Sequence, residues 1–342
     1  MRNNRNSDAE TRLSGSPNPV VGEKEAAMID GQAKDRRQKR RTRRRSGCLP
    51  AAAFLLLLAL TFFFLVRPAL SGLEDYLEKQ ESSIADSERK IEALPPPRIE
   101  AELEAKAACL WNSESDSFLY EKNAQEPAAP ASTSKLLTAL VTLDYCDPEE
   151  IVRVGGEIKR IGKSSSTIWL KKGDRLSVEH LLDGLLLSSG NDAAYALAVY
   201  TGRKIAGQQQ LSIDQALDLF LEKMNNKAGS LGAVNSLFTS PDGYDGDGFS
   251  TAADLARIGL AFFQNDLLQN IVETKELSVE WACGKSISHQ NFVEMLYPES
   301  PYYFPTLLGG KTGFTKRAGN CAVTAAAIND QVYICVVLGE EN

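Results

Sequence analysis

The chain has 342 residues, of which 43% are hydrophobic and 24% are charged. These proportions exclude a wholly disordered or fibrous protein and allow a sizeable core in about two domains. The formal net charge is −7, although residues 1–47 carry 13 Lys/Arg against 6 Asp/Glu. The six cysteines form no C-x-x-C pair and there are only two histidines, so we expect no metal centre.

The first predicted element is a membrane span over residues 48–66. All but two of these 19 residues are apolar, and no charge occurs between Arg45 and Arg67. At about 1.5 Å per residue, such a helix nearly crosses a hydrocarbon core of ~30 Å. Residues 36–45 hold eight basic side chains, so the positive-inside rule predicts that residues 1–47 are a cytoplasmic tail. We expect a single-pass protein of the cell membrane whose remaining residues are extracytoplasmic.

Two other interpretations of this region were weighed. A basic run can bind nucleic acid, but beside a membrane span it is typical of an orientation signal, so we expect no nucleic-acid partner. Residues 69–71 (Ala-Leu-Ser) are small enough for cleavage by a signal peptidase after Ser71. The apolar run is longer than a usual signal-peptide core, which favours an uncleaved anchor.

Residues 67–97 are expected to form a helical stalk followed by a linker. Apolar residues fall on one heptad register, interrupted at Gln80 and Ser87. A short helix explains this pattern, and dimerisation through it is an open alternative. Residues 95–97 are three prolines, which end a helix and favour an extended spacer. A folded domain is therefore expected over residues 98–342.

The pattern within this domain predicts an α/β fold of the α+β type, with strands near both ends and helices between them. Strands are predicted at 106–111, 117–121, 307–313, 320–328 and 332–338. Helices are predicted at 132–144, 178–187, 192–200, 213–228 and 252–263. The turn at Asn329-Asp330 joins the last two strands, and Thr251-x-x-Asp254 is a capping box. We expect the two ends of the domain to share one sheet.

Ser132 and Lys135 are the first candidate catalytic pair. Their spacing places both side chains on one face of a helix, about a turn apart. A lysine can take the proton of a serine only when it is neutral, and burial on an apolar helix lowers its pKa in that direction. A helix-capping serine beside an exposed lysine is the structural alternative.

Two more polar motifs interrupt apolar segments. Ser189-Gly190-Asn191 lies between two predicted helices, where a helix cap and a turn would also explain it. Lys311-Thr312-Gly313 lies on a predicted strand and lacks the upstream glycine spacing of a phosphate-binding loop. A β-bulge beside an exposed lysine is its structural alternative.

In this order, S-x-x-K, S-x-N and K-T-G resemble the signature of penicillin-binding proteins and class A β-lactamases. The chain is most similar to the serine D-alanyl-D-alanine carboxypeptidases, the low-molecular-mass penicillin-binding proteins, over about residues 104–338. The resemblance implies a β-lactamase/transpeptidase-like fold, an antiparallel sheet with a helical cluster. It also implies removal of the terminal D-Ala from peptidoglycan stem peptides, inhibition by β-lactams, and no cofactor.

The resemblance further implies a role for each motif residue. Ser132 would be the acylated nucleophile, Lys135 its base, and Ser189 the relay of a proton to the leaving group. The substrate would be bound by Asn191, Lys311, Thr312 and Gly313, with Lys311 at its terminal carboxylate. Backbone N–H groups of Ser132 and Phe314 would form the oxyanion hole.

Two departures from the family pattern bear on function. The deacylating E-x-x-L-N motif of class A β-lactamases has only a poorly spaced match, at 222–225 within a predicted helix, so fast β-lactam hydrolysis is not expected. The last strand ends close to Asn342, where relatives continue into a further helix, so we expect one face of the sheet to lack that cover. A D,D-endopeptidase, a β-lactamase relative and a catalytically idle scaffold protein of the cell wall are the alternatives.

The remaining reactive residue types suggest no second chemistry. His180 and His289 fit no catalytic triad, and we expect them to be surface or packing residues. Cysteines 109, 321 and 335 fall on predicted strands and Cys146 follows a helix. Small buried thiols are the expected state, although an exported domain would permit a disulfide.

Overall fold

The computed structural model describes residues 77–82, 99–244 and 247–341. The chain separates into two units, 1–94 and 95–342, and residues 77–82 of the first unit are helical. The span predicted at 48–66 lies outside the described residues. Within the described residues, no helix has both the length and the apolar character that crossing a membrane requires.

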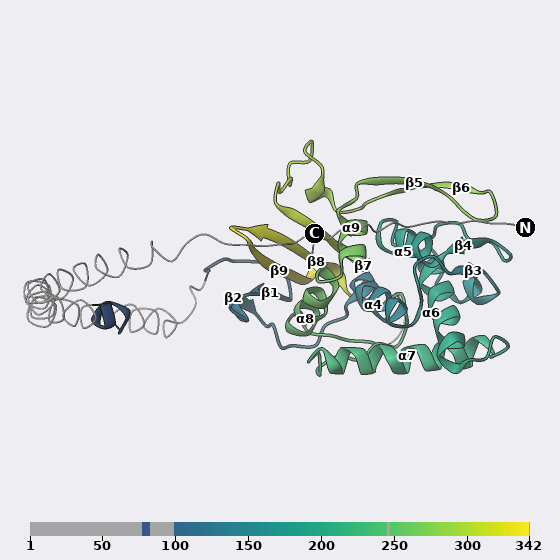
Figure 1. Ribbon diagram of the computed structural model, residues 1–342, viewed down its shortest axis with the longest axis horizontal. Coiled ribbons are helices and arrows are strands. Elements are labelled where there is room, and N and C mark those ends of the chain that lie inside the picture. The colour runs from purple at the N-terminus through teal and green to yellow at the C-terminus, as the bar shows by residue number, and fades with distance from the viewer. Residues whose placement is uncertain (1–76, 83–98, 245–246, 342) are drawn as a thin grey trace, which may run out of the picture. The chain divides into compact units, whose positions relative to one another are not determined.

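A five-stranded antiparallel sheet unites the two ends of the second unit, in the order β2-β1-β9-β8-β7 (Figure 1). Its strands are β1 (Ala107–Asn112), β2 (Ser117–Lys122), β7 (Leu307–Thr315), β8 (Gly319–Ile328) and β9 (Gln331–Glu340). Cys109 of β1 lies opposite Val336 of β9, which confirms the shared sheet. Asn329 and Asp330 both have positive φ, as expected for a two-residue hairpin turn.

One face of the sheet is covered by α8 (Ala252–Phe263), which packs on β1, β8 and β9. Close packing depends on Gly259, because a Cβ there would lie 3.0 Å from Val323 Cγ1. Alternate residues of β9 (334, 336 and 338) are buried, whereas residues 333, 335 and 337 are half-buried. A short helix, α9 (Asp266–Glu273), packs against β7.

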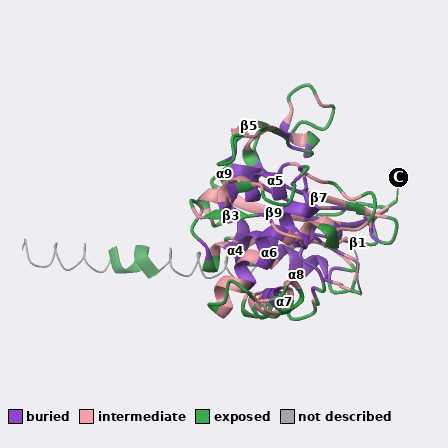
Figure 2. Cartoon of the chain, turned by 90° about the vertical axis from the view of Figure 1, so that its right-hand side faces the viewer, coloured by how far each residue is buried: buried purple, intermediate pink, exposed green. Residues whose placement is uncertain are grey.

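The helical cluster surrounds α4 (Lys135–Tyr145), which contacts four other helices and is buried over its first eight residues (Figure 2). Three of its neighbours are α5 (Val178–Leu186), α6 (Asn191–Ala206) and α7 (Ile213–Ser230), and the fourth is α8. These helices confirm the sequence prediction, with α6 extending beyond the predicted 192–200. The α+β prediction is likewise confirmed.

The helix predicted from Ser132 begins differently from the expectation. Residues Ala131–Ser134 form a 3₁₀ turn, and the α-helix starts at Lys135. Ala131 has a φ of +48°, and both the amide and the hydroxyl of Thr133 donate to the carbonyl of Pro130. These local bonds tighten the turn before α-helical geometry begins.

Several short elements were not predicted from the sequence. They are β3 (Ile151–Arg153), β4 (Arg175–Ser177), β5 (Glu276–Glu280), β6 (Ser286–Gln290), α9, and the 3₁₀ turns Glu157–Arg160 and Glu294–Leu296. Most are three to five residues long and largely exposed, so their apolar pattern is too weak to predict them.

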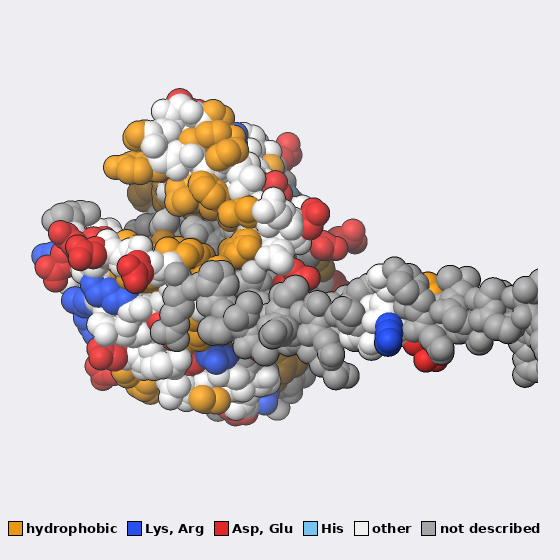
Figure 3. Space-filling view, turned by 90° about the vertical axis from the view of Figure 1, so that its left-hand side faces the viewer, with side chains coloured by type: hydrophobic (Ala, Val, Ile, Leu, Met, Phe, Trp, Pro, Cys, Tyr) orange, Lys and Arg blue, Asp and Glu red, His pale blue; other side chains and the backbone are white. Residues whose placement is uncertain are grey.

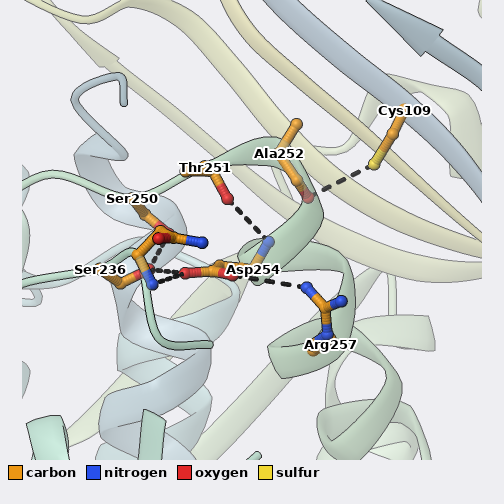
Figure 4. A network of polar contacts seen from close by, with 8 residues as sticks. Cys109, Ser236, Ser250, Thr251, Ala252, Asp254 and Arg257 are labelled. Carbon is orange, nitrogen blue, oxygen red and sulfur yellow. Dashed lines mark hydrogen bonds and ion pairs between the residues drawn. The ribbon is translucent and has the colours of Figure 1, made fainter. Parts of the chain in front are cut away.

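Asp254, at the start of α8, holds the irregular loop at Asn235 and Ser236 (Figure 4). Its buried carboxylate accepts hydrogen bonds from the amide of Asn235 and the hydroxyl of Ser236, both at 2.7 Å, and contacts Arg257 at 3.4 Å. Its own amide donates to Thr251 Oγ1, which confirms Thr251 as the N-cap, but the return bond of the predicted capping box is not formed because the Asp254 carboxylate bonds the loop instead. Asp254 therefore belongs to the N-terminal cap of α8 and also holds the loop at Asn235 and Ser236.

We predict that Asp254→Ala lowers the free energy of unfolding by about 3 kcal/mol. The substitution removes two partly buried hydrogen bonds to a charged acceptor, and each such bond is worth ~1.5–3 kcal/mol. Asp266→Ala is the control, because Asp266 is an exposed acid in the first turn of a helix and should change stability by less than ~1 kcal/mol. Denaturant titration measures both, and equal effects would contradict the assignment.

Candidate active site

The turn that carries Ser132 is held between a loop and a strand. A Cβ on Gly243 would lie 1.9 Å from the carbonyl oxygen of Ala131, and a Cβ on Gly313 would lie 2.6 Å from the amide nitrogen of Ser132. Only glycine permits such approaches, and Gly243 also has a φ of +69°. The backbone of the serine is therefore fixed from both sides.

Lys135 lies directly beneath Ser132 and is fully buried. Its Nζ is 2.8 Å from Ser132 Oγ, 2.7 Å from Asn191 Oδ1 and 3.1 Å from the carbonyl oxygen of Asp242. A neutral amine has two N–H donors and one lone pair. Asn191 and Asp242 can accept the two N–H donors, which leaves the lone pair for the proton of the Ser132 hydroxyl.

The ionisation of Lys135 is consistent with that arrangement. Burial lowers the pKa of Lys135 from 10.5 to about 8, against the smaller raising effects of Asp242 and Asp192. At neutral pH roughly a tenth of the molecules then carry the neutral amine, compared with less than ~0.1% for an ordinary lysine. The predicted serine and lysine are thus placed as a nucleophile and a base.

The Ser189-Gly190-Asn191 loop joins α5 to α6. Ser189 has a φ of +54°, and the amide of Gly190 donates to the carbonyl of Gly184. Asn191 binds Lys135 through its side chain, while its amide donates to the carbonyl of Ser166. The loop therefore connects Lys135 to the segment around Ser166.

Asp192 anchors that segment from below. Its buried carboxylate accepts hydrogen bonds from the amides of Ile168 and Leu170, at 3.0 and 2.9 Å. The sequence predicts Asp192 only as the first residue of a helix. In the folded protein its carboxylate also holds the segment that carries Ser164 and Ser166, and these two serines line the cleft.

Lys311 is buried on β7 rather than exposed, which excludes the structural alternative for this motif. Its Nζ donates to the carbonyl of Thr312 at 2.9 Å. Burial lowers its pKa well below the ordinary value, and the charge of the nearby Lys135 lowers it further. The two amines therefore disfavour being charged at the same time.

These residues surround one cleft of about 980 Å³. Among the predicted site residues, Ser132, Ser189, Asn191, Thr312, Gly313 and Phe314 line it. Lys311 is buried and is not among the lining residues.

Hydrophobic side chains gather at the top of the molecule in Figure 3, on the side of the segment between β6 and β7. A hollow of about 1000 Å³ beside β2 contains none of the predicted site residues in its lining.

Several residues of the cleft were not predicted from the sequence. Asp242 contributes its carbonyl to Lys135, and Tyr244 and Phe292 line the walls. Asp242 and Tyr244 belong to the glycine- and aspartate-rich segment 241–248. Phe292 and Phe314 are 53% and 60% exposed, and no periodic pattern distinguishes such side chains from surface residues.

A family model described as D-alanyl-D-alanine carboxypeptidase matches residues 92–342. The chain belongs to this family. The carboxypeptidase DacF of Bacillus subtilis is 30% identical over 242 residues, which are 69% of this chain and 57% of DacF. A D-alanyl-D-alanine endopeptidase of Pseudomonas aeruginosa is 30% identical over 72% of this chain and 76% of its own length. The chain thus spans little more than half the length of DacF.

The fold comparison agrees with the family match. The crystal structure of the Streptomyces K15 DD-transpeptidase is 28% identical and superposes with a TM-score of 0.64. The match covers 71% of this chain and 93% of that one. The transpeptidase-like fold expected from the three motifs is therefore confirmed.

We predict that the reactivity of Ser132 follows the ionisation of Lys135. The rate of reaction with a fluorophosphonate should rise about tenfold per pH unit and level off above a midpoint near pH 8, because the lowered pKa places the neutral amine in this range. Asp242→Asn should move the midpoint to lower pH by removing a charge that raises this pKa. Lys159→Ala, at an exposed lysine, is the control. A midpoint near pH 10 would contradict the burial argument.

Proposed function

We propose that residues 98–342 form a serine-type D-Ala-D-Ala carboxypeptidase, which removes the terminal D-Ala of peptidoglycan stem peptides through an ester on Ser132. The observation that carries the proposal is the buried Lys135 amine, 2.8 Å from Ser132 Oγ. Family membership and the named activities of the relatives support the choice of substrate.

The proposed reaction begins with attack of Ser132 Oγ on the carbonyl carbon of the last peptide bond. Lys135 takes the hydroxyl proton as the C–O bond forms, and the N–H groups of Ser132 and Phe314 stabilise the negative oxygen. When the C–N bond breaks, the proton passes from Lys135 through the Ser189 hydroxyl to the departing amine. Water then hydrolyses the ester and restores Ser132.

A free terminal carboxylate would select the correct substrate. The carboxylate would bind at the surface to Thr312 and favour the ammonium form of Lys311 beneath it. That positive charge would keep Lys135 neutral and therefore basic. In this proposal, binding of the substrate determines whether Lys135 or Lys311 carries the proton.

We predict that the purified protein releases D-Ala from a peptide that ends in D-Ala-D-Ala. Ser132→Ala or Lys135→Ala should lower the rate at least ~10³-fold, because nucleophile and base act as one unit. Ser134→Ala is the matched control, since this neighbouring hydroxyl has no hydrogen-bond partner among the described residues. Retention of activity by the Ser132 or Lys135 variant would overturn the proposal. A cross-linked stem-peptide dimer tests the endopeptidase alternative that the relative from P. aeruginosa suggests.

Benzylpenicillin should acylate Ser132 and remain bound. The opened ring stays tethered, so no leaving group makes room for water at the ester. The nearest match to a deacylating glutamate, Glu222, is exposed on α7 and paired with Lys223. Intact-protein mass spectrometry should find one added penicillin mass on the peptide that contains Ser132. Rapid turnover without an adduct would indicate a β-lactamase, and neither adduct nor turnover in folded protein would indicate an idle scaffold.

We also propose that the protein is anchored in the cell membrane by residues 48–66, with the catalytic unit outside. The support is the 19-residue apolar run and the basic residues that precede it. This placement would bring the cleft to the peptidoglycan side of the membrane. The anchor and the proposed substrate are thus consistent with one another.

We predict that protease added outside intact cells digests the catalytic unit and leaves residues 1–45 protected. An N-terminal tag should remain with the membrane-bound protein because the anchor is uncleaved. Immunoblotting of the tag before and after lysis measures this. Loss of the tag together with a new N-terminus at Gly72 would show cleavage after Ser71 instead.

A further inference from the structure

His289 belongs to a hairpin that the sequence did not predict. The strands β5 and β6 pair so that Leu277 lies opposite His289, and the hairpin lies beside α5 in Figure 1. His289 is 2% exposed, although the other four residues of β6 are half-buried or exposed. One polar side chain of this hairpin is therefore directed into the protein rather than toward solvent.

The buried ring contacts the loop that carries the S-x-N motif. Its Nδ1 lies 3.0 Å from the hydroxyl oxygen of Ser188. Its Cε1 packs against Gly184, where an added Cβ would lie 3.4 Å away. Gly184 in turn accepts the amide of Gly190 through its carbonyl. His289 thus contacts the last turn of α5 and Ser188, the residue that directly precedes the Ser189-Gly190-Asn191 loop.

The next residue, Ser189, has an unusual backbone. Its φ of +54° lies in the left-handed region, which a residue with a side chain adopts only when its surroundings enforce it. The bond from Gly190 to Gly184 holds one side of this turn, and the contact between Ser188 and His289 holds the other. Ser189 therefore lies between two residues, Ser188 and Gly190, that are each held by a hydrogen bond.

The ring is neutral under physiological conditions. Burial and, to a smaller extent, His180 lower the pKa of His289 to about 4. Within the described part of the chain, its Nε2 is buried and has no hydrogen-bond partner. The contact with Ser188 is therefore the polar interaction that fixes the orientation of the ring.

We propose that His289 is a positioning residue: through Ser188 it holds Ser189 where its hydroxyl can deliver a proton to the departing amine. This inference rests on the proposed function. It assigns to the β5–β6 hairpin a part in the breaking of the C–N bond, at a residue that does not itself touch the substrate.

Two substrates with the same acyl group separate this role from a structural one. A D-Ala-D-Ala peptide expels an amine, which must be protonated, whereas its thioester analogue expels a thiolate, which leaves without a proton. His289→Leu should slow acylation of Ser132 by the peptide about 10- to 100-fold and acylation by the thioester less than ~3-fold. Rapid-quench mass spectrometry of the acyl-enzyme under single-turnover conditions measures both rates.

Three further variants make the test specific. Ser188→Ala should reproduce the selective loss, and combining it with His289→Leu should add little, because both remove the same contact. His289→Asn keeps a hydrogen-bonding nitrogen near the position of Nδ1 and should restore most of the rate with the peptide. His180→Gln, at the neighbouring half-buried histidine, should leave the ratio of the two rates unchanged.

Equal losses on both substrates, or no loss on either, would overturn the proposal. If His289→Leu fails to fold, Ser188→Ala decides, because it removes only a hydroxyl group. An unchanged ratio in that variant also overturns the proposal. Failure of the proposed function looks different, since the wild-type protein would then release neither D-Ala nor thiol.

Discussion

The burial of one amine is the constraint on which the rest of the site depends. Lys135 has no exposed surface, and its Nζ contacts the turn before α4, the start of α6 and the loop at Asp242. Removal from water lowers its pKa, so the same burial that is unfavourable for an ammonium ion produces a base for Ser132. The three contacts also join segments that are far apart in the sequence. In the proposed mechanism, the contacts that bury Lys135 in the folded protein also make it a base for Ser132.

Close approach of backbones is the second constraint. Gly243 and Gly313 face the serine turn from opposite sides, at distances that exclude a Cβ. In the proposed mechanism, the two donors to one oxygen are the amide of Ser132 and that of Phe314, which follows Gly313 on the edge strand β7. Contacts between main-chain atoms hold the turn that carries Ser132 in position. Such contacts depend less on side-chain rotamers than contacts between flexible side chains do.

Buried carboxylates hold the irregular segments around the cleft. Asp192 binds the amides of Ile168 and Leu170, and Asp254 binds the amide of Asn235. Each lies in the first turn of a helix, where a negative charge is also favoured by the helix dipole. Loops without regular hydrogen bonding are thereby fixed to the most rigid elements of the unit. The contact between His289 and Ser188 follows the same principle, with an imidazole in place of a carboxylate.

The strands of the large sheet and the long helices of residues 95–342 could be predicted from the sequence, because each has an apolar pattern of the required period over enough residues. The sequence also determined the three motifs, whose order is specific even though each motif alone is weak. The burial of Lys135 and Lys311 became visible only in the folded structure. The same is true of the hydrogen bond between Lys135 Nζ and the carbonyl of Asp242. Every residue has a backbone carbonyl, so the sequence carries no signal for a contact that a carbonyl makes. A short exposed hairpin such as β5–β6 has too few buried residues to show a periodic apolar pattern. The ionisation of the base and the position of His289 both depend on contacts between distant segments, which local sequence does not encode.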